Sequence, residues 1–149
     1  MTETNFQAGS SPFDKLLGMR VEAASGDRVR AVLPVTPDLH QPYGIVHGGV
    51  YAALVESTAS IGAHLALQGA GRAVGISNHT EFLRAVRRGE LNAEAVPLAR
   101  GSSTQLWEVA VTDERGRPVA HGRVRLMNLR RDAGPRAAGG PEEESDARR

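Results

Sequence analysis

The sequence predicts one α+β domain in which an antiparallel sheet of five to six strands curls around one long central helix. Two observations lead to this fold class. Residues 48–67 form an apolar stretch with the length of a helix and very little charge. Most of the chain after that stretch consists of long strand-like segments separated by short turns.

The N-terminal part of the domain is expected to hold one short helix and two strands. Ser11 can cap the helix, Pro12 fits its first turn, and Gly18 can end it. In residues 28–31, arginines alternate with apolar residues, which indicates a half-buried strand. The segments expected before the long helix are a strand at 19–24, a turn at 25–27, a strand at 28–35 and a loop at 36–42.

The long helix is apolar or small on every side, which predicts a buried central helix and not an amphipathic surface helix. Glycines at 69 and 71 can end it. Turn residues at 87–89, 100–102 and 113–117 then separate antiparallel strands. These strands are expected at 72–82, 90–99, 103–113 and 118–129. A sheet that curls around one long helix in this way is the hotdog fold.

Length and composition limit the possible functions. The 149 residues fit one domain at 12–129, with a flexible N-terminus at 1–11 and a disordered tail at 130–149. The net charge of +1 gives no electrostatic argument for binding nucleic acid or an anionic membrane. The absence of cysteine excludes disulfides and a cysteine nucleophile. No secretory signal or membrane-spanning run is recognised, so a cytoplasmic protein is expected.

The start of the long helix combines features that suit acyl transfer. A helix N-terminus presents unpaired N–H groups and a partial positive charge. Gly48 and Gly49 have no side chains that would block a ligand oxygen from these groups. A carbonyl that becomes an oxyanion fits this position. The alternative is that His47, Gly48 and Gly49 only turn a loop into the helix.

Glu56 is the second notable feature of the helix. A carboxylate in an apolar helix is costly unless it is paired or hydrated, so Glu56 is either part of a site or the partner of an arginine from the sheet. Glu56 lies eight residues after Gly48, about 12 Å along the axis. Two helices packed antiparallel across a two-fold axis could each present Glu56 to the other's Gly48. The spacing therefore predicts a composite site at a dimer interface.

Three further polar residues lie near these groups. Ser60, one turn after Glu56, could orient the carboxylate or a water, or it could be a small packing residue. The Gln41 amide could hold a water or a carbonyl, or Gln41 could be an ordinary loop residue. His64 is expected to be structural.

The sequence also resembles a known family. Residues 41–49 (QPYGIVHGG), followed by Glu56 and Ser60, resemble the site motif of hotdog-fold acyl-CoA thioesterases. The similar group contains the 4-hydroxybenzoyl-CoA, 1,4-dihydroxy-2-naphthoyl-CoA and phenylacetate-pathway thioesterases. Residues 75–84 (GISNHTEFLR) are similar to the family's third strand, and residues 101–104 with Trp107 to its hairpin. At Arg84-Ala85-Val86 the chain departs from the usual Arg-Pro-Val.

The resemblance implies hydrolysis of an acyl-CoA, with an aromatic or medium-sized acyl group, by a homodimer or homotetramer without a metal or organic cofactor. The Gly48 N–H would polarise the thioester carbonyl, with Gln41 and His47 nearby. Glu56 of the partner subunit would act as nucleophile or as general base on water, and Ser60 would assist. The residues expected to bind the substrate or its CoA part are Arg84, Ser102, Ser103, Gly49, Asn78 and His79.

Two other functions remain open for such a fold. A hydratase or dehydratase usually combines an acid and a histidine in one site, whereas His47 and Glu56 are more than two turns apart and an Asp-x-x-x-x-His element is missing. A non-catalytic binder of acyl-CoA would use Glu56 only structurally. Loss of turnover with retained ligand binding in a Glu56→Ala variant would distinguish the thioesterase from both.

Overall fold

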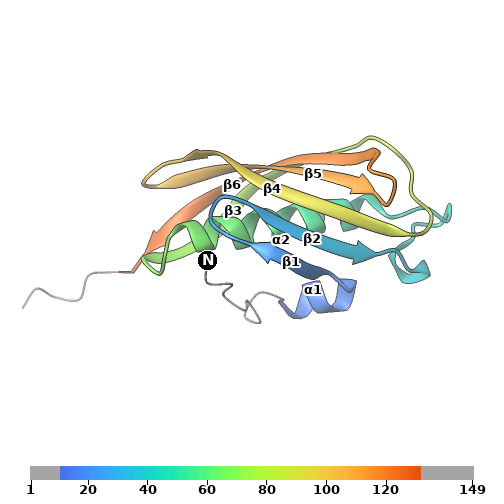
Figure 1. Ribbon diagram of the computed structural model, residues 1–149, viewed down its shortest axis with the longest axis horizontal. Helices are drawn as coiled ribbons and strands as arrows, with labels where there is room; N and C mark the ends of the chain where they lie inside the picture. The colour runs from blue at the N-terminus through green and yellow to red at the C-terminus, as the bar shows by residue number, and fades with distance from the viewer. Residues whose placement is uncertain (1–10, 132–149) are drawn as a thin grey trace, which may run out of the picture.

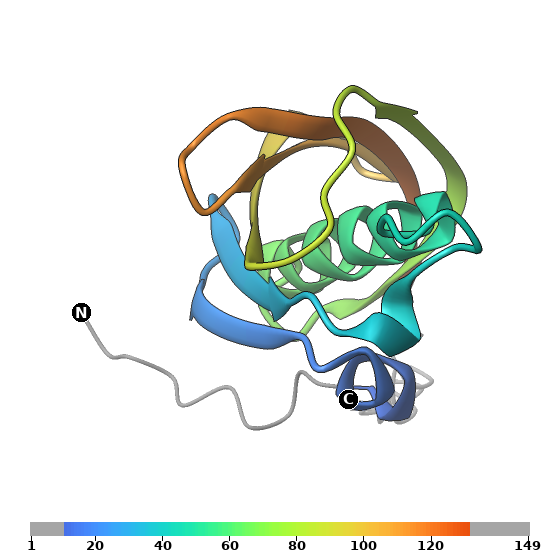
Figure 2. The same ribbon diagram turned by 90° about the vertical axis from the view of Figure 1, so that its right-hand side faces the viewer.

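The computed structural model describes residues 11–131, which form one six-stranded antiparallel sheet around a long helix (Figures 1 and 2). The strand order is β1-β2-β4-β5-β6-β3. The hotdog prediction is confirmed, and the boundaries of the long helix and of all six strands lie within one residue of those predicted. The elements are α1 (Pro12–Leu17), β1 (Arg20–Ala24), β2 (Val29–Pro34), η1 (Pro37–Leu39), α2 (Gly48–Ala66), β3 (Gly71–Phe82), β4 (Glu90–Arg100), β5 (Thr104–Asp113) and β6 (Pro118–Arg130).

Two segments differ from the prediction. The expected loop at 36–42 contains the short 3-10 helix η1, because Pro37 favours a helical φ and Leu39 is buried in the core. Arg130, which was assigned to the tail, continues β6 opposite Gly71. Most of the predicted flexible N-terminus (1–11) and disordered tail (130–149) lies outside the described residues.

Helix α1 begins and ends as its sequence indicates. The Ser11 side chain accepts from the Asp14 N–H, and the Asp14 carboxylate accepts from the Ser11 N–H, both at 3.1 Å. Gly18 closes the helix with φ 81°. The buried Asp14 also accepts the Ser57 hydroxyl at 2.5 Å, which fixes α1 to the long helix.

The sheet buries one side of α2, which lies inside the curl in both views (Figures 1 and 2). The buried residues are Val50, Tyr51, Leu54, Val55, Thr58, Ala59, Ile61, Gly62 and Ala63. On the other side, Ala52, Glu56 and Ser60 are only half-buried. The prediction of a central helix is confirmed, and within one chain the helix is buried on the side that faces the sheet and half-buried on the other. Its larger apolar side chains face the sheet together with Ala59, Gly62 and Ala63, whereas Ala52 and Ser60 remain partly exposed.

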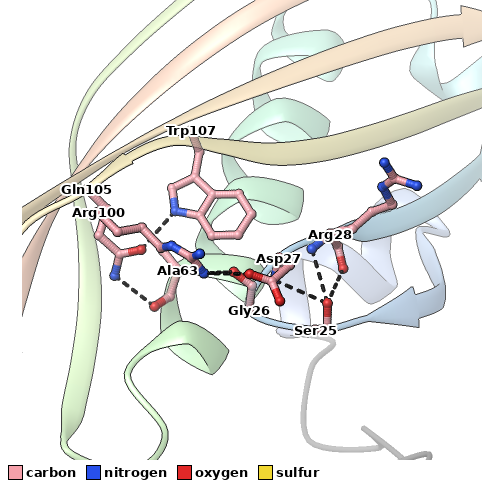
Figure 3. Close-up of polar contacts among 8 residues, drawn as sticks. All are labelled: Ser25, Gly26, Asp27, Arg28, Ala63, Arg100, Gln105 and Trp107. Atoms are coloured by element: carbon pink, nitrogen blue, oxygen red, sulfur yellow. Dashed lines mark hydrogen bonds and ion pairs between the residues drawn. The ribbon is translucent and has the colours of Figure 1, made fainter. Parts of the chain in front are cut away.

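Polar contacts fix the second half of α2 to β5 (Figure 3). The buried Trp107 indole donates to the Gln105 side-chain oxygen at 2.9 Å, and the Gln105 amide donates to the Ala63 carbonyl at 2.9 Å. A Cβ at Gly62 would lie 2.5 Å from the Trp107 ring, so the helix can approach this closely only with glycine there. These contacts fix the distance between α2 and the sheet and the position of the helix along β5.

Candidate active site

The conformation of the loop before α2 is stabilised by backbone hydrogen bonds and by the side chain of one arginine. The Gln41 N–H donates to the Ile45 carbonyl at 2.9 Å, and the Gly44 N–H donates to the Gln41 carbonyl at 3.0 Å. Gly44 has φ 71°, a conformation that favours glycine. The Arg87 guanidinium donates to the Tyr43 and Gly44 carbonyls at 3.2 and 3.3 Å. Arg87 therefore holds the loop that leads into the helix.

At the helix start, one backbone N–H remains available. The Gly49 N–H donates to Nδ1 of the N-cap residue His47 at 2.8 Å, and the Val50 N–H donates to the His47 carbonyl at 2.9 Å. Within residues 11–131, the Gly48 N–H has no hydrogen-bond partner. Because Nδ1 of His47 accepts, the ring carries its proton on Nε2. The Gly48 N–H and the His47 Nε2–H are thus the donors that this helix end offers to a ligand.

The aromatic side chains of Phe82 and Tyr51 lie next to Gly48. A Cβ at Gly48 would lie 2.6 Å from the Phe82 ring, and the ring centroids of Phe82 and Tyr51 are 5.8 Å apart. The Phe82 side chain is 58% exposed, whereas Tyr51 is buried. The Tyr51 hydroxyl has no partner within the described residues. Burial raises the pKa of Tyr51 above its ordinary value, so the hydroxyl stays protonated at neutral pH.

Glu56 lies on the half-buried side of α2, against strand β3. Its Oε2 accepts from Nδ2 of Asn78 at 3.0 Å. Its Oε1 lies where a side chain at Gly75 would have to begin, so the carboxylate contacts the strand backbone directly. None of the ion pairs within residues 11–131 involves Glu56, so the structure does not contain the expected alternative, a Glu56–arginine pair.

The structure does not bring the predicted catalytic residues together within one chain. Gly48 and Glu56 are separated by eight residues of the same helix, about 12 Å. Ser60 lies one turn beyond Glu56 and has no hydrogen bond with it, and the Gln41 side chain has no hydrogen-bond partner in the described part of the chain. His64 is exposed near the end of the helix.

The residues predicted to contact CoA are also far apart. Arg84 follows β3, and its N–H donates to the Val119 carbonyl at 3.2 Å, near the beginning of β6. Ser102 and Ser103 lie in the β4–β5 hairpin, where their carbonyls accept from Asn128, near the end of β6. One chain therefore places these two groups at opposite ends of the same strand.

The other predicted ligand-binding pair, Asn78 and His79, points to opposite faces of β3. Both contacts of the Asn78 amide nitrogen are with α2, one with Glu56 and one with the Ala52 carbonyl. His79 is exposed on the outer face, with its ring 3.9 Å from the Glu81 carboxylate. Only Asn78 lies at the helix.

Two contacts of this region were not anticipated from the sequence, namely Asn78 with Glu56 and Phe82 with Gly48. Asn78, Thr80 and Phe82 occupy alternate positions of β3, so all three face α2. The signal that could have indicated the first contact was a polar residue at a helix-facing position of a strand, in a chain whose apolar helix carries one glutamate. The second depends on the strand's position along the helix, which no local pattern indicates.

Within residues 11–131, no three His, Asp or Glu side chains are grouped so that they could hold a metal ion. None of the helices in this range is both long and apolar enough to cross a membrane.

Comparison with known proteins gives a consistent result. The family model described as Thioesterase superfamily matches residues 43–120, more than half of the chain. The Mycobacterium tuberculosis protein Rv1847 is 46% identical over 79% of this chain and 86% of its own length. Its solved structure has a TM-score of 0.80 and covers 81% of this chain and 98% of that one.

Two relatives have names that state an activity. The 1,4-dihydroxy-2-naphthoyl-CoA hydrolase of Escherichia coli is 32% identical over 72% of this chain and 79% of its own. The solved structure of thioesterase HI1161 from Haemophilus influenzae is 31% identical, with a TM-score of 0.79, and covers 83% of this chain and 87% of that one.

Proposed function

The chain belongs to the thioesterase superfamily and is a thioester hydrolase, and from this premise we propose that its substrate is an acyl-CoA with an aromatic or medium-sized acyl group. The single observation that carries the proposal is the free Gly48 N–H beside Phe82 and Tyr51. A carbonyl on this N–H has an apolar aromatic surface next to its acyl group. The name of the Escherichia coli relative supports an aromatic acyl-CoA.

In the proposed reaction, the Gly48 N–H binds the thioester carbonyl oxygen and stabilises the negative charge that develops on it. As general base, Glu56 takes a proton from a water whose oxygen bonds to the carbonyl carbon. The C–S bond then breaks, and the CoA sulfur takes the proton that Glu56 had accepted, which restores the carboxylate. As nucleophile, Glu56 itself displaces the CoA thiolate and forms an acyl anhydride, which water hydrolyses. Both routes need the same two groups.

We assign Glu56 to a site that contains Gly48 of the partner subunit. Three observations support this arrangement: the distance of about 12 Å between the two residues in one chain, the half-buried side of α2, and the position of β3 at the edge of the sheet. An unpaired edge strand of 12 residues is a ready surface for pairing with another chain. The proposed assembly is a homodimer, or a homotetramer built from two such pairs.

The same arrangement would also join the residues assigned to CoA. Two β3 strands that pair antiparallel across a two-fold axis place the end of one beside the beginning of the other. Arg84 follows the end of β3, and Ser102 and Ser103 lie beside the residues of β6 that pair with its beginning. Arg84 would thus approach Ser102 and Ser103 of the partner subunit, where a guanidinium can bind CoA phosphate.

The substrate proposal is tested by following free CoA release from a panel of acyl-CoAs with a thiol reagent. This protein has no cysteine and does not itself react with the reagent. We expect turnover of aromatic or medium-sized acyl-CoAs and slower turnover of acetyl-CoA and long-chain acyl-CoAs. A folded protein that releases CoA from none of them would contradict the proposal.

The composite site predicts complementation between two inactive variants. Glu56→Gln removes the carboxylate, and Gly48→Pro removes the N–H. A dimer with one subunit of each kind has one intact site, made of Gly48 from the first and Glu56 from the second. With random pairing, half of the dimers are mixed, so co-expressed variants should regain about a quarter of wild-type turnover.

In the matched control, the two variants are purified separately and then mixed under conditions in which dimers do not exchange subunits. This mixture should have no activity. A site formed within one chain would leave the co-expressed pair as inactive as each parent, and this outcome would contradict the composite site. Dual affinity tags isolate the mixed dimers, whose turnover should then be about half that of the wild type.

A further inference from the structure

The Asn78 side chain has three hydrogen bonds, two with α2 and one with its own strand. Its Nδ2 donates to Glu56 Oε2 and to the Ala52 carbonyl, both at 3.0 Å. Its Oδ1 accepts the Thr80 hydroxyl at 2.7 Å. Every atom of this amide that can form a hydrogen bond therefore has a partner on α2 or on its own strand.

The chemistry of these partners fixes the orientation of the amide. The Ala52 carbonyl and the Glu56 carboxylate are acceptors only, so they require the nitrogen. Turning the amide over would place Oδ1 against two acceptors and would leave the Thr80 hydroxyl facing an N–H. The Ala52 carbonyl and the Glu56 carboxylate thus select the orientation of the amide. The Thr80 hydroxyl donates to Oδ1 and holds the amide in this orientation.

The backbone of the sheet makes room for this arrangement. A Cβ at Gly75 would overlap Glu56 Oε1. A Cβ at Gly122, which pairs with Thr80 across β3 and β6, would lie 2.8 Å from the Thr80 hydroxyl oxygen. Both glycines are at positions where only a bare backbone allows the carboxylate and the hydroxyl to sit where they do.

We propose that Asn78 is a positioning residue for Glu56 and that Thr80 holds Asn78 in the orientation it needs. Ala52 lies one turn before Glu56, so the two N–H groups of Asn78 fix the carboxylate relative to its own helix. Oε2 accepts from Asn78, and Oε1 lies against Gly75 and makes no hydrogen bond within residues 11–131. Ordering a flexible glutamate before the substrate arrives reduces the entropic cost of reaching the reactive geometry. The inference rests on the proposed function of Glu56.

The first test replaces Asn78 with alanine. We expect kcat for the best acyl-CoA of the panel to fall about 10- to 100-fold while KM changes less than about twofold, because the residue acts on Glu56 and not on the substrate. Ser77→Ala, an adjacent change whose side chain is outside this network, should leave both constants at wild-type values. Wild-type kcat in Asn78→Ala would overturn the proposal.

The second test uses Thr80, which keeps the proposal testable if Asn78→Ala does not fold. Thr80→Val has nearly the same shape but no hydroxyl, so Oδ1 of Asn78 loses its hydrogen-bond donor and the amide is held less firmly. We expect kcat to fall about 3- to 10-fold, and we expect Thr80→Ser, which restores the hydroxyl, to recover most of it. Equal activity of the valine and serine variants would contradict the role of Thr80.

A double-mutant cycle separates positioning from general stabilisation. If Asn78 acts through Glu56, Asn78→Ala should have no further effect on the residual turnover of Glu56→Gln, measured at high enzyme concentration. A loss of the same factor in both backgrounds would indicate a purely structural role. Failure of the proposed function is distinguishable, because it would leave Glu56→Gln as active as the wild type whatever Asn78 does.

Discussion

Replacing Glu56 with glutamine is expected to reduce thioester turnover by about 10²- to 10⁴-fold, the range for loss of a general base. The change removes the negative charge but keeps nearly the same shape. The glutamine oxygen can still accept from Asn78, as Oε2 of Glu56 does at 3.0 Å. The measurement is CoA release with a thiol reagent at saturating substrate, together with thermal unfolding to show that the fold is retained.

Glu94→Gln is the matched control. Glu94 lies on β4 and pairs with Arg30 at 2.9 Å and with Arg28 at 3.8 Å on the outer face of the sheet, so its loss removes two exposed ion pairs and nothing at α2. We expect wild-type turnover from this variant. Turnover of Glu56→Gln within a factor of about two of the wild type would show that Glu56 neither attacks the carbonyl nor activates water.

The fold could be predicted because its signals are local. Residues 48–66 are mostly apolar or small, and the strands that follow are separated by turns with glycine or charged residues. The capped start of α1 at Ser11 and its end at Gly18 follow from single residues in the same way. Such patterns do not depend on distant parts of the chain, which is why the predicted boundaries agree so closely with the structure.

Which residues of α2 are buried and which are partly exposed could not be predicted in the same way. A stretch of Ala, Gly and Ser is compatible with burial and also with partial exposure. The reason is that moving a small side chain from water to the protein interior changes the free energy of folding only slightly. In the structure Leu54 and Val55 are buried, but so are Ala59 and Ala63, whereas Ala52 and Ser60 are partly exposed. Residue type alone therefore does not separate the two sides.

The prediction of the site was limited by the position of β3 along α2. The sequence indicated Gly48 and Glu56 because each is unusual in its own surroundings. The contact of Glu56 with Asn78 depends on how β3 lies against the helix, and a register shift between Gly75 and Ser77 alters which residues of β3 oppose those of β6. A shift of this kind changes which side chains face the helix. The regular alternation of side chains along a strand does not show where such a shift occurs.

Gly48→Pro is expected to turn over acyl-CoA about 10²- to 10³-fold more slowly than Gly48→Ala, which is the effect of losing one oxyanion donor. Gly48 is the first residue of α2, where proline fits the helix. His47 before it has φ −65° and ψ 137°, the extended conformation that a residue preceding proline adopts. Proline therefore removes an N–H that has no partner in the described part of the chain, and it leaves the hydrogen bonds of the helix in place.

The comparison with alanine separates the effect of losing the Gly48 N–H from the effect of adding a side chain. Both substitutions add a Cβ that would lie 2.6 Å from the Phe82 ring, so the ring must move in both variants. The ratio of their kcat values thus cancels the steric effect, and it should persist when both are made with Phe82→Ala. Equal turnover of the proline and alanine variants would mean that another group binds the oxyanion. The His47 Nε2–H would then be the next donor to remove, because it is the other one that the helix start offers.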